Sequence, residues 1–384
     1  MHKYGIKDYD VVIVGAGPAG CTCALALKQS GLKIALVDKA KFPRKKVCGD
    51  LITGRAIKIL NKLSPAYVEE LKNTQNLLIN RKTATYYKNK RLEFKWVNEA
   101  CLCSRKDFDN FLLNLVKKNT NTDIYEGFNI DDIKNNNEKV CITADNDKIV
   151  INTKIIIGAD GARSIVAKKL SNRLSEDKYK VDAVQVYFKN VKCSSDNTAE
   201  IYFDKKFLPG YFWLFALPDN IVNVGFGMLT KEIKHRKINI KEAFYSFINE
   251  SEILKEKFKN SEQICEIEGA RLPIGSKITN VSGERFLLTG DAASLIDPLN
   301  GEGIGNAMLS GKTAASQVVK SFENNDFSAG YHKNYDKELK KSIGKELQSR
   351  YKMMTLFLRI RIIPGLIFFL ATNRYIRKRI QKFL

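Results

Sequence analysis

The residues best suited to chemistry lie in one short loop that combines a thiol with positive charge. The segment KFPRKKVCGD spans residues 41–50 and places Cys48 and Gly49 directly after a cluster of cations. A thiol beside positive charge loses its proton more readily than a free cysteine. We therefore expect Lys45 and Lys46 to lower the pKa of Cys48, which would suit it to proton transfer. Gly49 would let the backbone approach a ligand closely, and this positioning is the alternative reason for the motif.

A second group of chemically suitable residues is aromatic and lies on one predicted strand. In the segment YFWLFA, alternation along a strand places Tyr211, Trp213 and Phe215 on one face and Phe212 and Leu214 on the other. Three rings on one face can line an apolar tunnel for a substrate and exclude water. The same alternation also fits an ordinary hydrophobic core.

The elements that would position these groups begin at the N-terminus. An apolar run over 9–14 leads into GAGPAG at 15–20, a helix from about 21 to 29 follows, and a second strand over 33–38 ends in an acid. This order is typical of a dinucleotide site, with glycines at the turn, the diphosphate at the helix start and the acid on the ribose. A glycine-rich turn of an ordinary α/β domain is the alternative. The residues assigned to the cofactor here are Gly15, Gly17, Pro18, Ala19, Gly20, Asp38 and Lys39.

A second glycine-rich turn returns late in the chain. The segment TGDAASLIDPLNGEGIG covers residues 289–305 and reads as a loop that enters a helix. One nucleotide fold needs only the first turn, so the second indicates a long, two-part cofactor such as FAD. A helix start offers unpaired N–H groups and partial positive charge, which suits the anionic edge of a reduced flavin. The residues assigned to the cofactor here are Gly290, Asp291, Pro298, Gly301, Gly303 and Ile304.

Composition indicates a globular protein with an unusual charge. The chain has 384 residues and a net charge of +22. No nucleic-acid-binding module is recognisable, so the charge alone predicts only non-specific attraction. The first residues lack a secretory apolar core, and we expect a cytoplasmic protein with no processed leader. The eight cysteines form no C-x-x-C pair and there are only three histidines, so we expect reduced thiols and no metal site.

The C-terminal segment 347–384 contains cations but no Asp or Glu. Within it, the apolar run 362–371 is far shorter than the roughly 20 residues that span a bilayer. Two interpretations fit: an in-plane anchor on the inner face of an anionic membrane, or a core helix with a solvated basic end.

The chain divides into interleaved segments. We assign 8–80, 101–180 and 270–320 to a Rossmann-type domain for the cofactor, 81–100 and 181–269 to an antiparallel sheet domain for the substrate, and 321–384 to a helical tail. Strands are expected over 182–188, 199–203 and 221–227, and a hairpin tip over 134–139. The fold class is therefore α/β, or α+β overall.

Two further motifs give the chain a family resemblance. The segments IIIGADGARS at 155–164 and SRKDFD at 104–109, together with both glycine-rich turns, resemble FAD-dependent proteins of the para-hydroxybenzoate hydroxylase type over most of residues 8–320. The resemblance implies that Asp160 and Gly161 contact FAD and that Arg105 contacts its phosphates, where a guanidinium fork fits well. A surface arginine on an amphipathic helix is the alternative for Arg105.

Within that fold, the loop around Cys48 is similar to the K-x-C-G loop of geranylgeranyl reductases, which lies by the flavin ring. This similarity adds Arg44, Cys48 and Gly49 to the residues assigned to the cofactor. The segment GYFWLFALP resembles the Y-x-W-x-F-P motif of the same branch, although Ala216 and Leu217 separate Phe215 from the proline.

Three functions remain open at this point. The first is a reductase of C=C bonds in a prenyl chain, with hydride from reduced flavin and Cys48 assisting the proton. The second is a monooxygenase or halogenase, although the halogenase string G-x-W-x-W-x-I-P is absent. The third is a membrane-surface electron-transfer flavoprotein. There is no second GxGxxG unit, so the electron donor is left open between NAD(P)H and a ferredoxin or quinol. We expect a lipophilic substrate and a monomer.

Overall fold

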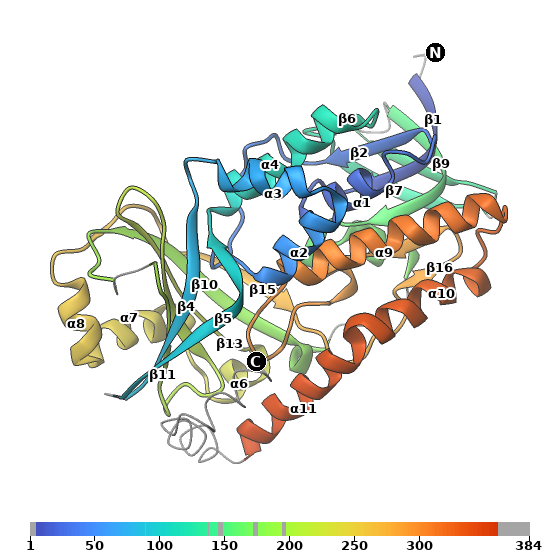
Figure 1. Ribbon diagram of the computed structural model, residues 1–384. Coiled ribbons are helices and arrows are strands. Elements are labelled where there is room, and N and C mark those ends of the chain that lie inside the picture. Colours follow the sequence, from blue (N-terminus) through green and yellow to red (C-terminus); the bar gives the residue numbers. More distant parts are fainter. Residues whose placement is uncertain are drawn as a thin grey trace.

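Two sheets organise the protein (Figure 1). The computed structural model describes residues 5–88, 90–136, 138–144, 149–171, 176–193 and 197–359. Together with the helical C-terminal part, the sheets confirm the predicted mixed α/β class. The boundaries assigned to the domains stay a prediction.

The first sheet has a parallel centre whose strands are nearly continuous apolar runs. Val11, Val12 and Ile13 are fully buried, as expected for parallel strands that helices cover on both faces. The hairpin predicted at 134–139 is confirmed by the antiparallel pairing of β7 with β8. In order, the sheet contains β16 (Ser282–Gly283), β17 (Phe286–Leu288), β9 (Ile149–Gly158), β1 (Gly5–Val14), β2 (Ile34–Asp38) and β6 (Asp123–Glu126); β8 (Val140–Ala144) also pairs with β9, and β7 (Ile130–Asn135) pairs with β8.

Helices α1 (Pro18–Ala26) and α9 (Ile304–Glu323) pack closely beside this sheet. A Cβ atom at Gly311 of α9 would lie 2.1 Å from the carbonyl oxygen of Ala19. The backbones of the two helices are therefore in contact at Gly311, where no side chain separates them. The helix expected over 21–29 in fact begins at Pro18, since proline is well suited to a first helical turn, and ends at Ala26. Gly31, with φ of +71°, then turns the chain into β2. The remaining helices near this sheet are α2 (Gly54–Leu63), α3 (Pro65–Lys72), α4 (Arg105–Asn119) and α5 (Ile165–Leu170).

The second sheet is mostly antiparallel, and one of its faces is covered by helices α7 (Ile240–Glu250) and α8 (Glu252–Phe258). Phe212 and Phe226 point into that covered face, where they pack against Phe244 and Phe247. The opposite face is therefore available to the site. In order, the sheet contains β14 (Glu262–Gln263), β10 (Lys180–Lys189), β13 (Ile221–Leu229), β12 (Tyr211–Ala216), β11 (Ala199–Phe203), β4 (Leu78–Tyr87), β5 (Lys90–Leu102) and β3 (Leu51–Ile52), with β15 (Glu268–Pro273) on β10; the short helix α6 (Thr230–His235) follows β13.

The C-terminal part is helical, as expected, and the described portion packs on the core. Helix α10 (Ala329–Leu339), one π-helical turn and α11 (Lys345–Arg359) follow one another along one side of the molecule (Figure 1). Arg350, a cation of the segment 347–384, is 8 % exposed and donates to Asp297 at 2.7 Å, so this residue faces the core. The apolar run 362–371 lies outside the described residues. Over the described ranges, the helices are all too short or too polar to cross a bilayer.

Candidate active site

The first and middle motifs meet at Gly15. Its φ is +103°, and a Cβ atom there would lie 2.3 Å from the carbonyl oxygen of Ala159, next to Asp160. A Cβ at Gly20 would lie 1.8 Å from the oxygen of Gly15, which explains why the turn needs glycine at both positions. Gly161, with φ of +78°, continues the middle motif.

Asp38 holds the glycine turn from the end of β2. Its carboxylate accepts hydrogen bonds from the amides of Ala16 and Ala40, both at 2.8 Å. Lys39 follows it on the surface. The acid therefore lies beside the start of α1, and its contact with the ribose stays a prediction.

The late turn also joins this group. Gly290 has φ of +56°, and a Cβ there would lie 3.4 Å from the Cβ of Ala19 and 3.1 Å from that of Ala307. Its amide donates to the hydroxyl of Ser310 at 2.9 Å. Gly303 then precedes Ile304, where α9 begins. The starts of α1 and α9 thus lie close together although 286 residues separate Pro18 from Ile304.

The residues present fit FAD by their own geometry. Within 4 Å of a Cβ placed at Gly17, the one described atom is a guanidinium nitrogen of Arg44, at 3.5 Å. An uncrowded helix start that faces a cation suits a diphosphate. The carboxylate of Asp291 makes no hydrogen bond or ion pair with other described residues, which leaves it free for a hydroxyl of the ribityl chain.

A buried charge cluster lies beneath this turn. Asp109 accepts two bonds of 2.7 Å from Arg105 and lies 3.1 Å from Arg44. Arg105 is only 8 % exposed, so the alternative of a surface arginine is wrong. Arg44, by its distance to Gly17, is the guanidinium nearer to the expected diphosphate, and the phosphate contact of Arg105 stays a prediction.

The loop around Cys48 is held against the open face of the second sheet. The Cys48 amide donates to Oε1 of Gln185 at 3.0 Å, and its carbonyl accepts from Nδ2 of Asn223 at 2.7 Å. A Cβ at Gly49 would lie 3.0 Å from the ring of Phe215 and 3.5 Å from Nε1 of Trp213. Glycine therefore lets the backbone pack directly on the aromatic rings, where a side chain would press on Phe215.

The expected lowering of the Cys48 pKa by neighbouring lysines is wrong. Burial raises the pKa of this thiol, and the opposing influence comes from the Arg105 guanidinium, not from a lysine. Lys46 instead points toward the middle motif, with its Nζ 3.6 Å from a Cβ placed at Gly161. The Cys48 side chain is half-buried and neutral at physiological pH.

Asp50 was not predicted, and it is the most buried ionisable group of the loop. It is 0 % exposed and accepts hydrogen bonds from the Tyr187 hydroxyl at 2.7 Å, Nδ2 of Asn223 at 2.6 Å and the Arg105 amide at 3.0 Å. Burial raises its pKa to about 6, although these donors oppose the shift. The available signal was a polar Asn223 inside the otherwise apolar strand IVNVGFGML.

Register explains why these groups share one face. Tyr187 and Phe215 both lie opposite Asn223, while Gln185 and Trp213 lie opposite Gly225. Side chains on paired positions of neighbouring strands point the same way. The predicted alternation of Tyr211, Trp213 and Phe215 on one face therefore also brings the polar groups of β10 and β13 to the loop.

The loop 298–303 closes the third side of this face. Tyr211 donates to the carbonyl of Asn300 at 3.0 Å, and its hydroxyl lies 2.6 Å from a Cβ placed at Gly301. Gly301 has φ of +74° and follows Pro298 in this loop. The structure thus places the Cys48 loop, the aromatic strand and the second glycine-rich turn side by side.

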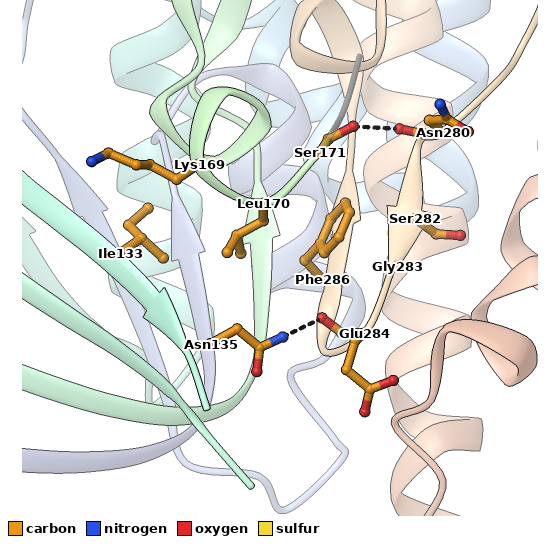
Figure 2. Close-up of a pocket in the computed structure, with 10 residues that line it drawn as sticks. All are labelled: Ile133, Asn135, Lys169, Leu170, Ser171, Asn280, Ser282, Gly283, Glu284 and Phe286. Atoms are coloured by element: carbon orange, nitrogen blue, oxygen red, sulfur yellow. Dashed lines mark hydrogen bonds between the residues drawn. The ribbon is translucent and has the colours of Figure 1, made fainter. Parts of the chain in front are cut away.

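A separate hollow of about 490 Å³ lies elsewhere on the first sheet (Figure 2). Strands β7, β16 and β17 and helix α5 surround it, with Asn135, Lys169 and Phe286 among its lining residues. Lys169 is paired with Asp132 at 2.6 Å. None of the predicted site residues lines this hollow, so it is distinct from the site described above.

The geometry defines a two-sheet protein in which the glycine-rich turns of a dinucleotide-type site lie beside the aromatic face of the second sheet. A family described as the FAD binding domain matches residues 8–341. This match covers most of the chain, so the protein belongs to that family, and it is an FAD-dependent oxidoreductase.

Named relatives extend over most of the chain. A menaquinone reductase of Mycobacterium tuberculosis is 27% identical and covers 80% of this chain and 75% of its own. A digeranylgeranylglycerophospholipid reductase of Methanocella arvoryzae is 25% identical, with 90% and 86% covered. Among solved structures, a geranylgeranyl bacteriochlorophyll reductase-like protein of Thermoplasma acidophilum has a TM-score of 0.79 at 24% identity, covering 91% and 88%.

The fold alone does not separate reductases from halogenating enzymes. A flavin-dependent brominase has a TM-score of 0.80 at 18% identity and covers 98% of this chain and 93% of its own. At such identities these likenesses establish a shared fold. The choice of reaction therefore depends on the residues of the site.

Proposed function

We propose that this protein is a flavin-dependent reductase that saturates C=C bonds in the prenyl chain of a lipid. The observation that carries the proposal is the packing of the Cys48–Gly49 backbone directly on the rings of Trp213 and Phe215. This contact joins a thiol to an apolar wall beside the cofactor site. The named relatives support the substrate class, since menaquinone and digeranylgeranylglycerophospholipids both carry prenyl chains.

The side chains of the site would supply what the reaction needs besides the cofactor. Reduced FAD, when bound, supplies the hydride. Trp213 and Phe215 would bind the chain and exclude water. Cys48 would hold a proton at Sγ for the second carbon, because burial keeps its pKa raised. The Arg105 guanidinium opposes this rise in the Cys48 pKa, and its positive charge would stabilise the thiolate that remains after the proton is transferred.

The proposal is tested under anaerobic conditions with dithionite as reductant, because this needs no assumption about the natural donor. Geranylgeranyl lipids and menaquinone are the substrates, and mass spectrometry follows the product. A reductase adds two hydrogens for each bond without O2. Products that contain oxygen or halogen and form only with O2 would overturn the proposal in favour of a monooxygenase or halogenase.

Two half-buried cysteines in different parts of the fold provide the matched variants. We expect Cys48→Ala to retain FAD absorbance but to reduce turnover by about 10²-fold, within the usual range for a lost proton donor. Cys141→Ala is the control, because Cys141 is also half-buried but lies on β8, away from the site. Equal turnover in both variants would leave Cys48 without a catalytic role.

We also propose that the C-terminal segment contacts the inner face of the membrane, where such a substrate resides. The sequence of 360–384 combines the apolar run 362–371 with cations at Arg374, Arg377 and Lys378. Because Arg350 packs on the core, the truncation that tests this must end at Arg359. We expect it to keep FAD and to lose co-sedimentation with anionic vesicles; retained binding would contradict the anchor.

A further inference from the structure

Asp50 is a completely buried carboxylate at the junction of three elements. Its hydrogen-bond donors come from β10 (Tyr187), β13 (Asn223) and the first residue of α4 (Arg105). The carbonyl of Asp50 also accepts from the Cys103 amide at 3.0 Å. Both its side chain and its backbone are therefore held, and the loop cannot shift without breaking several of these bonds.

Two of these partners also hold other parts of the site. Asn223 donates through the same Nδ2 to the carbonyl of Cys48 and accepts from Nε1 of Trp213 at 2.9 Å. Arg105, whose amide binds Asp50, places its guanidinium on Asp109 beneath the glycine turn. Asp50 is thus bonded directly to residues that orient the thiol loop, the aromatic wall and the cofactor side.

A purely structural role of Asp50 would explain why its carboxylate is fully hydrogen-bonded. It would not explain why one of its donors, Asn223, also holds the backbone of Cys48. The Cys48 amide donates to Gln185 and the Cys48 carbonyl accepts from Asn223. Both backbone polar groups of the residue that carries the thiol are therefore held by hydrogen bonds. If the carboxylate of Asp50 is altered, Asn223 loses one of the two acceptors of its Nδ2, and the hydrogen bond that holds the Cys48 carbonyl is weakened.

We propose that Asp50 is a positioning residue that, through Asn223 and Tyr187, holds the Cys48 thiol in one orientation over the aromatic face. Its meaning for catalysis rests on the proposed function, whereas the positioning itself does not. The groups that face the carboxylate are Tyr187, Asn223, Arg105 and the Cys48 thiol. Since burial raises the Asp50 pKa to about 6, the positioning weakens when the carboxylate gains a proton near that pH.

The first variant is Asp50→Asn, which keeps the shape but offers one acceptor oxygen instead of two. Its NH2 group must face either the Arg105 amide or the donors of Tyr187 and Asn223. In both orientations an N–H donor of the introduced amide group meets another donor, and at least one of the three hydrogen bonds is lost. Tyr187→Phe is the milder variant, because it removes one donor and leaves the carboxylate. Glu200→Gln is the control: Glu200 is also fully buried, but it lies on the helix-covered face, beside Lys257.

The probe is dithiodipyridine, a thiol reagent that reacts at acidic as well as neutral pH. The FAD-loaded protein is labelled, and mass spectrometry of peptides gives the rate at Cys48, with Cys141 as internal reference. At pH 7.5 we expect about tenfold faster labelling in Asp50→Asn, the size expected when a hydrogen bond to a charged group is lost, and wild-type labelling in Glu200→Gln. The ratio of Asp50→Asn to wild-type rates should fall toward one as pH drops through about 6.

A wild-type labelling rate in folded, yellow Asp50→Asn protein would overturn the proposal. If that variant does not fold, Tyr187→Phe decides: a rate increase of a few-fold supports positioning, and an unchanged rate overturns it. No substrate is present in this assay, so its result is independent of the reaction. Where the reductase assay also succeeds, Asp50→Asn should lower kcat and leave KM unchanged.

Discussion

The ring of Trp213 lies across β13 at Gly225, and this contact provides a sharp test of how the aromatic face is built. A Cβ atom at Gly225 would lie 2.1 Å from Cζ2 of Trp213 and 2.5 Å from Cε2. At Gly227, two residues along the same face, the nearest atoms to a Cβ lie 3.6 Å away. Gly225→Ala and Gly227→Ala are therefore the same change on one strand with opposite steric consequences.

The size of the effect follows from the distance that the ring must move. To reach an ordinary contact of 3.4 Å, Cζ2 would have to withdraw by about 1.3 Å from its present 2.1 Å. This movement stretches the 2.9 Å bond from Nε1 to Asn223. Overpacking costs about 1–3 kcal/mol and an unsatisfied buried acceptor about 1–3 kcal/mol, so Gly225→Ala should destabilise the protein by about 2–6 kcal/mol. Gly227→Ala should change the free energy of unfolding by about 0.5 kcal/mol or less, in either direction.

The assay is urea unfolding of FAD-loaded protein, followed by circular dichroism and by tryptophan fluorescence in a Trp96→Phe background. That background makes Trp213 the single tryptophan of the chain. We also expect a shifted emission maximum in the folded Gly225→Ala variant. Equal free energies of unfolding in the two alanine variants would refute this account of the face, because Trp213 lies 2.1 Å from a Cβ at Gly225 but 3.8 Å from one at Gly227.

Three other predictions concern separate parts of the molecule. Gly311→Ala places a Cβ 2.1 Å from the backbone oxygen of Ala19, which cannot rotate away, so α9 must move from α1; fluorescence titration should give at least about tenfold weaker FAD binding. Arg350→Met leaves Asp297 buried without its cation and should cost about 3–5 kcal/mol in urea unfolding, whereas an effect below about 1 kcal/mol would show that the backbone amides suffice. For Asp50, a pKa raised from 3.8 to about 6 means that folding favours the protonated acid. Its stabilising contribution is nearly complete at about pH 3 and is lost as pH rises through 6, so wild type should lose about 3 kcal/mol relative to Asp50→Asn between pH 3 and pH 7; parallel curves would contradict the shift.

The first sheet and its glycine turn could be predicted because their signals are local. A continuous apolar run specifies a buried strand, and glycine at Gly20 is required by its contact with the carbonyl oxygen of Gly15 inside the same strand–turn–helix unit. Asp38 follows from the spacing along the same unit. The helix limits were less accurate, since the end of α1 at Ala26 depends on the turn at Gly31 and on packing rather than on apolar pattern.

The interactions of the site could not be predicted, because they join distant segments. Asp50 is 137 residues from Tyr187 and 173 from Asn223, so only the register of the second sheet brings them together. Local charge was also misleading at Cys48. The neighbouring lysines suggested a lowered pKa, whereas the folded chain buries the thiol and directs Lys46 toward Gly161. Desolvation outweighs sequence proximity when the charges point elsewhere.

The two interpretations of the aromatic strand, substrate wall and core, turn out to be compatible. Trp213 and Phe215 are 7% and 6% exposed, as core residues would be. Part of their surface is covered, however, by the backbone of Gly49, while Tyr211 is held by the Asn300 carbonyl. Both covering segments belong to the loops assigned to the flavin rather than to the sheet itself. A substitution that displaces these rings should therefore alter the environment of the bound flavin as well as the stability, whereas a substitution of Phe212 on the opposite face should alter stability alone.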